Sequence, residues 1–240
     1  MKPNRTLHLL CAGAAQGVVK ALQPRLLGAT GAQLNARFGA VGAMKEALLA
    51  GEPCDLMVVT GKMVDELVAS GALRGSEGGS PRAALGRVQT GIAVRSGAPR
   101  PDVSTPAALK AALLAADAIF FPDALRATAG IHFANVMREL GVAEQLAPRW
   151  RTYPNGATAM REMAATDAPR LIGCTQVTEI NYTEGVDLVG VLPQAFQLAT
   201  LYSAAVSTNA AEPALAARFI AMLTGADSRA LREAGGFELS

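Results

Sequence analysis

Residues 38–60 read FGAVGAMKEALLAGEPCDLMVVT, and this stretch decides the fold class. It opens with an aromatic residue and a small, glycine-containing turn. Residues 40–50 have the apolar spacing of a helix, and Gly51 follows them where a helix commonly ends. Residues 55–60, DLMVVT, then form a compact apolar run typical of a buried strand. A turn, a helix and a buried strand in this order predict a βαβ unit and a mostly parallel sheet.

The same alternation continues on both sides of this block. On the amino-terminal side we expect a strand, a helix that Pro24 should kink or divide, and a second strand, at residues 7–12, 14–27 and 32–38. A helix is expected at 62–70, a loop at 75–81 and a Pro- and Ser-rich linker at 96–106. Further strands are expected at 87–95, 118–121, 171–174, 186–191 and 198–207, with helices at 109–116, 128–140, 157–165, 211–223 and 228–234.

Two long strands bracket the second set of elements and predict two crossovers between two lobes. Lobe 1 would consist of residues 1–91 and 200–240, and lobe 2 of residues 92–199, with hinge strands near 88–95 and 198–206. In open parallel sheets, ligands bind outside the carboxyl ends of the strands. A ligand is therefore expected in a cleft between the lobes.

Composition excludes several classes of function. Half of the residues are hydrophobic, which predicts a packed core, while the net charge of +2, the absence of a Lys/Arg run and a single Trp argue against nucleic acid. No apolar run approaches the roughly 20 residues of a membrane span, so membrane insertion is not expected. With two histidines and no glycine-rich phosphate motif, we expect neither a metal nor another cofactor.

The cysteines and the first residues add two expectations. Cys11, Cys54 and Cys174 lie far apart and are interpreted as buried small hydrophobes, with a reactive thiol considered mainly at Cys174. The first residues read as a strand and turn of the mature protein rather than as a signal peptide. The protein is therefore expected in the periplasm if a signal peptide has been removed, and otherwise in the cytoplasm.

Five strand-to-helix junctions are candidate anion-binding positions, because helix starts present backbone N–H groups and a positive dipole end. A plain turn is the alternative at each one, and Thr128 and Asn155 are equally interpretable as helix N-caps. Early in the second set, His132 is a candidate general base, with a surface or core histidine as the alternative. The junction residues are Gly13, Ala14 and Ala15; Ala40, Val41 and Gly42; Thr128, Ala129 and Gly130; Asn155 and Gly156; and Thr175 and Gln176.

Several segments resemble the periplasmic molybdate-binding proteins of ABC transporters. They are LHLLCAGAAQGVVKAL at residues 7–22, the block at 38–60, ATAGIHFANVMRELGV at 127–142 and AGGFE at 234–238. The resemblance covers nearly the whole chain. It implies an α/β protein with a two-lobed type II periplasmic-binding-protein fold, in which each lobe is a mostly parallel sheet flanked by helices. It also implies a small anionic ligand in the interlobe cleft and an ABC permease as partner.

The resemblance also implies which positions would touch the ligand. The two serines that bind molybdate in the family fall on Ala14 or Ala15 and near Val41, its tyrosine falls near Thr175, and backbone contacts fall on Ala129 and near Asn155. Alanine and valine have no hydroxyl group, so the hydrogen bonds of both serines would be lost. Each hydrogen bond to a charged group contributes roughly 1.5–3 kcal/mol to binding. An organic di- or tricarboxylate is therefore expected rather than molybdate. Because aconitate isomerase resembles the same family, an isomerase that shifts a proton on an unsaturated tricarboxylate such as aconitate is the alternative.

Overall fold

The computed structural model describes residues 5–75 and 83–239. These residues form two compact units. One, here called the terminal unit, comprises Met1–Arg87 and Thr200–Ser240, and the other, the middle unit, comprises Val88–Ala199. Strand β4 (Ala83–Arg95) and strand β9 (Ala199–Val206) include the two places where the chain passes from one unit to the other. Of the loop expected at 75–81, all but Gly75 lies outside the described residues.

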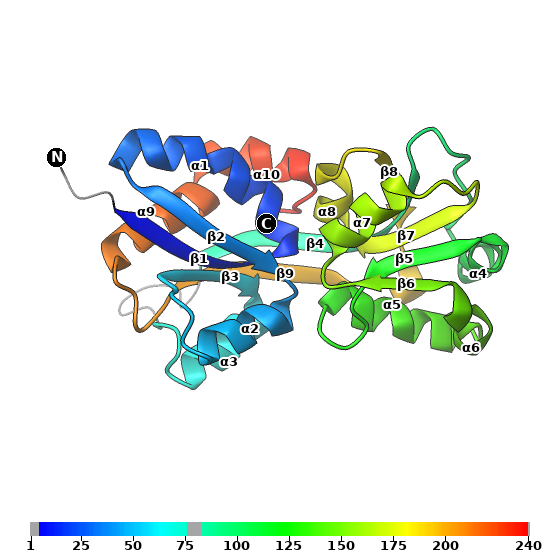
Figure 1. Ribbon diagram of the computed structural model, residues 1–240, viewed down its shortest axis with the longest axis horizontal. Helices are drawn as coiled ribbons and strands as arrows, with labels where there is room; N and C mark the ends of the chain where they lie inside the picture. Colours follow the sequence, from blue (N-terminus) through cyan, green and yellow to red (C-terminus); the bar gives the residue numbers. More distant parts are fainter. Residues whose placement is uncertain (1–4, 76–82, 240) are drawn as a thin grey trace. The chain divides into compact units, whose positions relative to one another are not determined.

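The terminal unit is built on a sheet with the order β2-β1-β3-β9. Strand β1 (Thr6–Ala12) pairs in parallel with β2 (Gln33–Gly39) and β3 (Leu56–Thr60), while β3 pairs antiparallel with β9. Every residue of β3 is buried, as its apolar run predicts. Helices α1 (Gln16–Thr30), α9 (Pro213–Thr224) and α10 (Arg229–Gly235) lie on one side of this sheet, and α2 (Val41–Leu49) and α3 (Gly61–Ala69) lie on the other (Figure 1).

Asp55, the residue that precedes β3, joins separate parts of the terminal unit. Its carboxylate accepts hydrogen bonds from the backbone N–H groups of His8 and Glu212, each at 2.8 Å. The side chain is almost fully buried, with 1% exposure. A buried carboxylate needs such donors, so Asp55 acts as a structural tie between β1 and the segment before α9.

The middle unit is built on a sheet with the order β4-β7-β5-β6, and β8 (Val186–Val191) also pairs with β4. Strand β5 (Ala118–Pro122) pairs in parallel with β6 (Trp150–Tyr153) and β7 (Leu171–Gln176), while β4 is antiparallel to β7. In Figure 1, α5 (Thr128–Glu139) and α6 (Ala143–Leu146) lie on one side of this sheet, and α7 (Gly156–Ala165) and α8 (Val177–Tyr182) lie on the other. The remaining helices of this unit are α4 (Pro106–Ala115), η2 (Ala147–Arg149) and η3 (Gln194–Phe196).

Strand β5 supplies both halves of the middle unit's core, because successive side chains of a strand point to opposite faces. Ile119 and Phe121 belong to the cluster on the α5 side, where the rings of Phe121 and Phe133 meet edge to face at 5.6 Å. Phe120 belongs to the other cluster, together with Met160 of α7. The strand is thus covered by helices on both faces, which is why all five of its residues are buried.

Three expectations about elements need correction. Pro24 does not divide helix α1, because that residue is exposed and the carbonyl group left without its usual N–H donor can be hydrated. Helix α4 begins three residues earlier than expected, since Thr105 caps it by accepting from Ala108 N at 3.1 Å. Strand β6 was not expected, because WRTY is short and partly exposed and has no apolar run.

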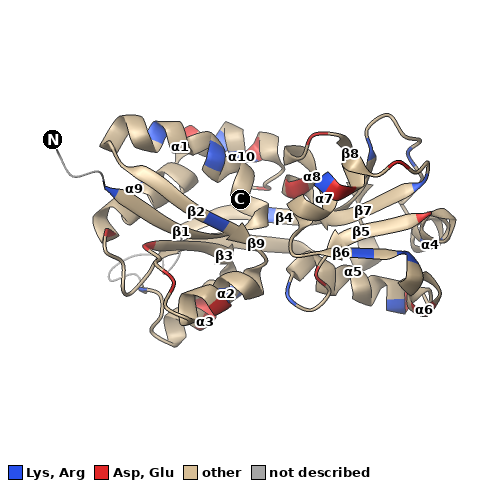
Figure 2. Ribbon diagram, in the orientation of Figure 1, with Lys and Arg blue, Asp and Glu red and all other residues tan. Residues whose placement is uncertain are grey.

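Charged residues of both signs are interspersed over both units, without a large area of one sign in the view of Figure 2. Within residues 5–75 and 83–239, no helix is long and apolar enough to cross a membrane. In the same residues, His, Cys, Asp and Glu form no group of three or more that could hold a metal ion.

Candidate functional site

In the terminal unit, three helices begin at the carboxyl ends of the parallel strands. Strands β1, β2 and β3 run parallel and lead into η1 (Gly13–Ala15) with α1, into α2, and into α3. Of these, α3 begins with a side-chain cap, because Thr60 Oγ1 accepts from Met63 N at 3.3 Å. The other two begin without one, since Ala12, Ala15 and Ala40 stand at the capping positions.

Most residues of these two uncapped starts are glycine or alanine, with Gln16 and Val41 as the larger ones. The first backbone N–H groups of a helix have no acceptor within the helix. Here they belong to Gly13, Ala14, Ala15, Val41 and Gly42, all but Gly42 buried. Hydrogen atoms and methyl groups leave room for an approaching oxygen atom and provide no competing acceptor. Both starts can therefore donate to an anion through the backbone alone.

Helix α5 provides a comparable start in the middle unit. Its N-cap is Ala127, so Thr128 is the first helical residue and the interpretation of Thr128 as N-cap is wrong. No side chain caps this helix. A Cβ atom on Gly130 would clash with the carbonyl oxygens of Pro122 and Asp123, so the start of α5 is pressed against the end of β5. The backbone N–H groups of Thr128, Ala129 and Gly130 are those that such a helix start presents.

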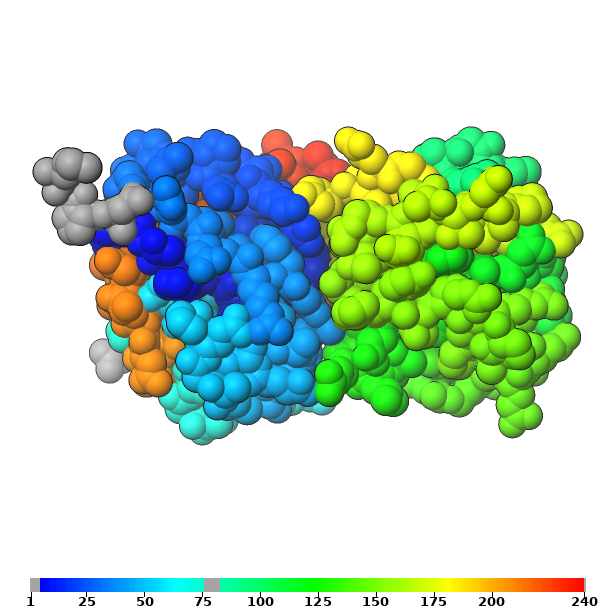
Figure 3. All heavy atoms as spheres, viewed as in Figure 1, coloured from blue at the N-terminus to red at the C-terminus, as the bar shows by residue number. Residues whose placement is uncertain are grey.

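The start of α7, by contrast, is already satisfied by side chains of the middle unit. Asn155 is its N-cap and accepts from Thr158 N at 2.8 Å, so its interpretation as a helix cap is confirmed, while its contact with a ligand stays a prediction. Oε1 of Glu179, a residue of α8, accepts from Ala157 N at 3.3 Å. Residues around 150–165, yellow-green in Figure 3, form much of the unit's surface on the face shown, but Gly156 and Ala157 themselves are buried.

Glu179 is a buried carboxylate that sequence reasoning missed. Burial raises its pKa above the ordinary value of a glutamate, while hydrogen bonds from Thr175 and from the N–H groups of Ala157, Gln176 and Gly156 oppose the rise. Thr175 Oγ1 donates to Glu179 Oε2 at 2.5 Å. In the sequence, a Glu near a short helix looks like a solvated residue, and its partner Ala157 lies 22 residues away.

Thr175 and Gln176 both have their polar side chains engaged within the middle unit. The Thr175 hydroxyl is bound to Glu179 and has 0% exposure. The Gln176 amide nitrogen, in the orientation that its surroundings favour, donates to the carbonyl oxygens of Val88 at 3.2 Å and Gln89 at 3.3 Å. Their contact with a ligand stays a prediction.

Two buried hydroxyl groups that sequence reasoning also missed lie near the end of β7. Thr90 stands opposite Gln176 in the pairing of β4 with β7, and Thr178 is in the first turn of α8. Both side-chain oxygens are buried and have no hydrogen-bond partner among the described residues. Buried hydroxyls in proteins are normally paired, so these two are available to water or to a ligand. Nothing in the sequence distinguishes a buried threonine with a free hydroxyl from one whose hydroxyl is paired.

His132, the candidate base, has one ring nitrogen fixed. Its Nε2 lies 2.7 Å from the carbonyl oxygen of Phe196. Because a carbonyl can only accept, Nε2 carries the proton and the neutral ring has its basic lone pair on Nδ1.

The interpretation of Cys174 as a reactive thiol is wrong, because the residue has 0% exposure and burial raises its pKa well above the ordinary value.

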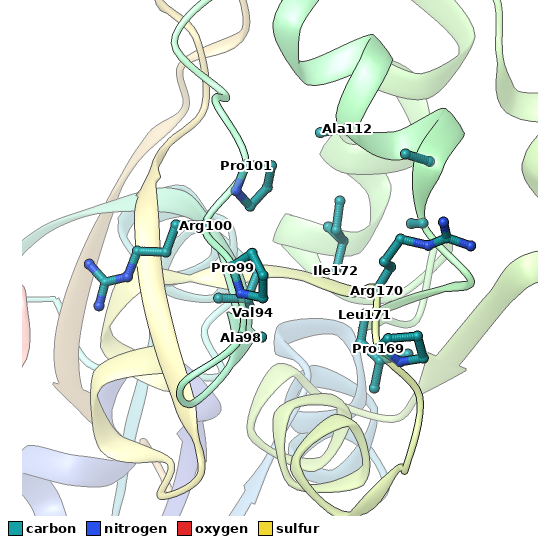
Figure 4. Close-up of a pocket in the computed structure, with 12 residues that line it drawn as sticks. Val94, Ala98, Pro99, Arg100, Pro101, Ala112, Pro169, Arg170, Leu171 and Ile172 are labelled. Atoms are coloured by element: carbon teal, nitrogen blue, oxygen red, sulfur yellow. The ribbon is translucent and has the colours of Figure 1, made fainter.

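A small cavity of about 200 Å³ lies at the other end of the middle unit's sheet. Its walls are mostly apolar and include Ala112, Leu171 and Ile172 together with three prolines (Figure 4). Leu171 begins β7, so the cavity is at the amino ends of the strands, opposite the helix starts. In Figure 4 the guanidinium groups of Arg100 and Arg170 point away from it, and they pair with Asp187 and Asp117.

Comparison with known proteins identifies the family. The sequence model of bacterial extracellular solute-binding proteins matches residues 7–238, and the chain belongs to this family. An aconitate isomerase from Pseudomonas sp. is 28% identical over 244 residues, which cover 98% of this chain and 88% of that protein.

Solved structures show the same fold. The periplasmic molybdate-binding protein of Azotobacter vinelandii superimposes with a TM-score of 0.78 at 18% identity, over 98% of this chain and 99% of that one. The protein PEB3, solved with bound L-phospholactate, gives a TM-score of 0.69 at 13% identity, over 98% and 100% of the two chains. The expected α/β fold of periplasmic binding proteins and the resemblance to molybdate-binding proteins are thus confirmed.

Proposed function

We propose that this solute-binding protein binds a small organic di- or tricarboxylate. The observation that carries the proposal is the set of uncapped helix starts, η1 with α1 and α2 in the terminal unit and α5 in the middle unit. Each offers backbone N–H donors at the carboxyl end of a parallel strand. The unpaired hydroxyls of Thr90 and Thr178 are additional donors for a polar ligand.

The donor set favours a carboxylate over molybdate. Ala14, Ala15 and Val41 provide backbone N–H groups but no hydroxyl, whereas a compact dianion needs many short donors. Two missing hydrogen bonds to a charged group weaken binding by roughly 3–6 kcal/mol. A larger anion with separated carboxylates fits the space that the alanines leave. Among similar proteins, PEB3 binds L-phospholactate, a small organic anion, in its solved structure, and the Pseudomonas relative is an aconitate isomerase.

Isomerisation of aconitate is the second candidate, and the 28% identity to an aconitate isomerase favours it. The basic Nδ1 of His132 would remove a proton from the methylene carbon of the tricarboxylate. The electron pair would shift the double bond, and the proton would return to the former vinyl carbon, so no co-reactant is consumed. If the protein is instead a transport component, it acts outside the cytoplasm and delivers its ligand to an ABC permease.

A thermal-shift screen tests the ligand class. The probes are molybdate, tungstate, sulfate, citrate, cis-aconitate and trans-aconitate. A ligand at 100 times its dissociation constant adds about 2.7 kcal/mol to the free energy of unfolding. We expect this rise with tricarboxylates. A rise with molybdate or tungstate alone would refute the proposed ligand class.

Nuclear magnetic resonance in D₂O then separates the two candidate functions. Conversion of cis- to trans-aconitate with incorporation of deuterium identifies an isomerase, and binding without exchange identifies a carrier. Changing His132→Ala should abolish exchange while the affinity for aconitate stays within about threefold. Full exchange in that variant would remove His132 from the reaction.

A further inference from the structure

Glu179 occupies the start of α7 in the way that a bound anion would. Its oxygens accept from Ala157 N at 3.3 Å and from Thr175 Oγ1 at 2.5 Å, and the N–H groups of Gly156 and Gln176 also favour its ionised form. The residue has 5% exposure, and no charged side chain among the described residues acts on it. The helix start therefore offsets part of the cost of burying this carboxylate.

The backbone around this carboxylate leaves space for it only because residue 156 is glycine. A Cβ atom built on Gly156 would clash with both Thr175 Oγ1 and Glu179 Oε2. Asn155 satisfies the next N–H group of the same helix start, that of Thr158. Glu179 and Asn155 thus accept hydrogen bonds from the first N–H groups of α7. The start of α5, which follows the adjacent strand β5, has no side-chain cap.

We propose that Glu179 is a specificity-determining positioning residue, a resident anion that withholds the start of α7 from the ligand. This inference deepens the proposed function and rests on it. In the middle unit, the ligand then accepts hydrogen bonds from the backbone N–H groups of α5 and not from those of α7. The negative charge of Glu179 at the start of α7 opposes a compact dianion more than it opposes an anion whose carboxylates are spread apart.

Removing the side chain should convert the start of α7 into a binding position for an added anion. In the Glu179→Ala variant the melting temperature falls, and formate raises it again in a saturable manner. Formamide, which has the same shape without the charge, has no such effect. The control variant is Glu162→Ala, on the exposed face of α7. In the wild type and in this control, formate should change the melting temperature no more than chloride does at the same concentration. This readout needs no natural ligand.

Selectivity provides the second readout. The ratio of sulfate to citrate affinity should rise about tenfold or more in Glu179→Ala, the change expected when donors to a charged group become available. If Glu179→Ala does not fold, Glu179→Gln keeps the shape, removes the charge, and should raise the same ratio. A formate response equal to that of formamide, or an unchanged ratio in the folded variant, overturns the inference. Wild-type protein that binds no carboxylate overturns the proposed function instead, while formate rescue still tests the role of Glu179.

Discussion

Single residues determine which N–H groups of the candidate site are already bound to a side chain, and their roles depend on neighbours that are distant in sequence. Glu179 illustrates this at the residue scale. Its position next to Thr175 is local, but its burial results from the packing of α8 against α7. No sequence pattern encodes that contact, because a glutamate in a short polar segment is usually solvated.

The raised pKa of Glu179 makes a prediction about stability and pH. Below the ordinary pKa of 4.5, the side chain is protonated in both the folded and the unfolded state. As the pH rises above that value, the unfolded state ionises first, so folding loses free energy until the folded-state pKa is reached. Urea unfolding of the wild type and of Glu179→Gln should therefore show the wild type losing stability relative to the variant as the pH rises through that window. A difference that is constant with pH contradicts this account.

Gly156 and Gly28 provide a matched pair of glycine substitutions. Changing Gly156→Ala should lower the free energy of unfolding by about 1–3 kcal/mol, because the new methyl group overlaps Thr175 and Glu179. Gly28→Ala should raise it by about 0.5–1 kcal/mol, because that residue lies in α1 with open space around it. Chemical denaturation measures both changes. Equal effects of the two substitutions would be inconsistent with a closely packed start of α7.

At the scale of elements, most of the fold could be predicted from the sequence. The pattern of residues 38–60 specified β3 and α2, because burial on both faces requires an apolar run and Gly51 adopts the left-handed conformation, with φ of 83°. Strand β6 could not be predicted, since parallel pairing with β5 stabilises it rather than its own composition. The helix starts were expected at the correct junctions, but their capping depends on tertiary contacts.

The uncapped start of α2 leads to a prediction in which one substitution raises the stability of the protein and weakens its binding of the ligand. Ala40→Asp places an acceptor at the N-cap of α2, and such a cap contributes about 0.5–2 kcal/mol to stability. The same carboxylate competes with an anionic ligand for the N–H groups and should weaken its binding at least tenfold. The control is Thr105→Ala, which removes the cap of α4. It should lower stability by a similar amount without changing affinity, and parallel losses of affinity in both variants would refute a role for the start of α2.

At the scale of the whole molecule, the proposed function makes a prediction about the compactness of the protein with and without ligand. The helix starts are divided between the units, so neither unit contains the complete set of proposed donors. Binding that requires both units should bring them together. Small-angle X-ray scattering is expected to show a smaller radius of gyration with a saturating tricarboxylate than without ligand. An unchanged radius would place the ligand within one unit.

The central claim is that backbone donors without serine hydroxyls select an organic carboxylate over a compact oxyanion. The most direct measurement is a calorimetric titration of the wild-type protein with trans-aconitate, citrate and molybdate under one set of conditions. The account predicts saturable binding of at least one tricarboxylate, at least tenfold tighter than that of molybdate. Tighter binding of molybdate would contradict it and would show that the helix starts alone are sufficient for a compact dianion.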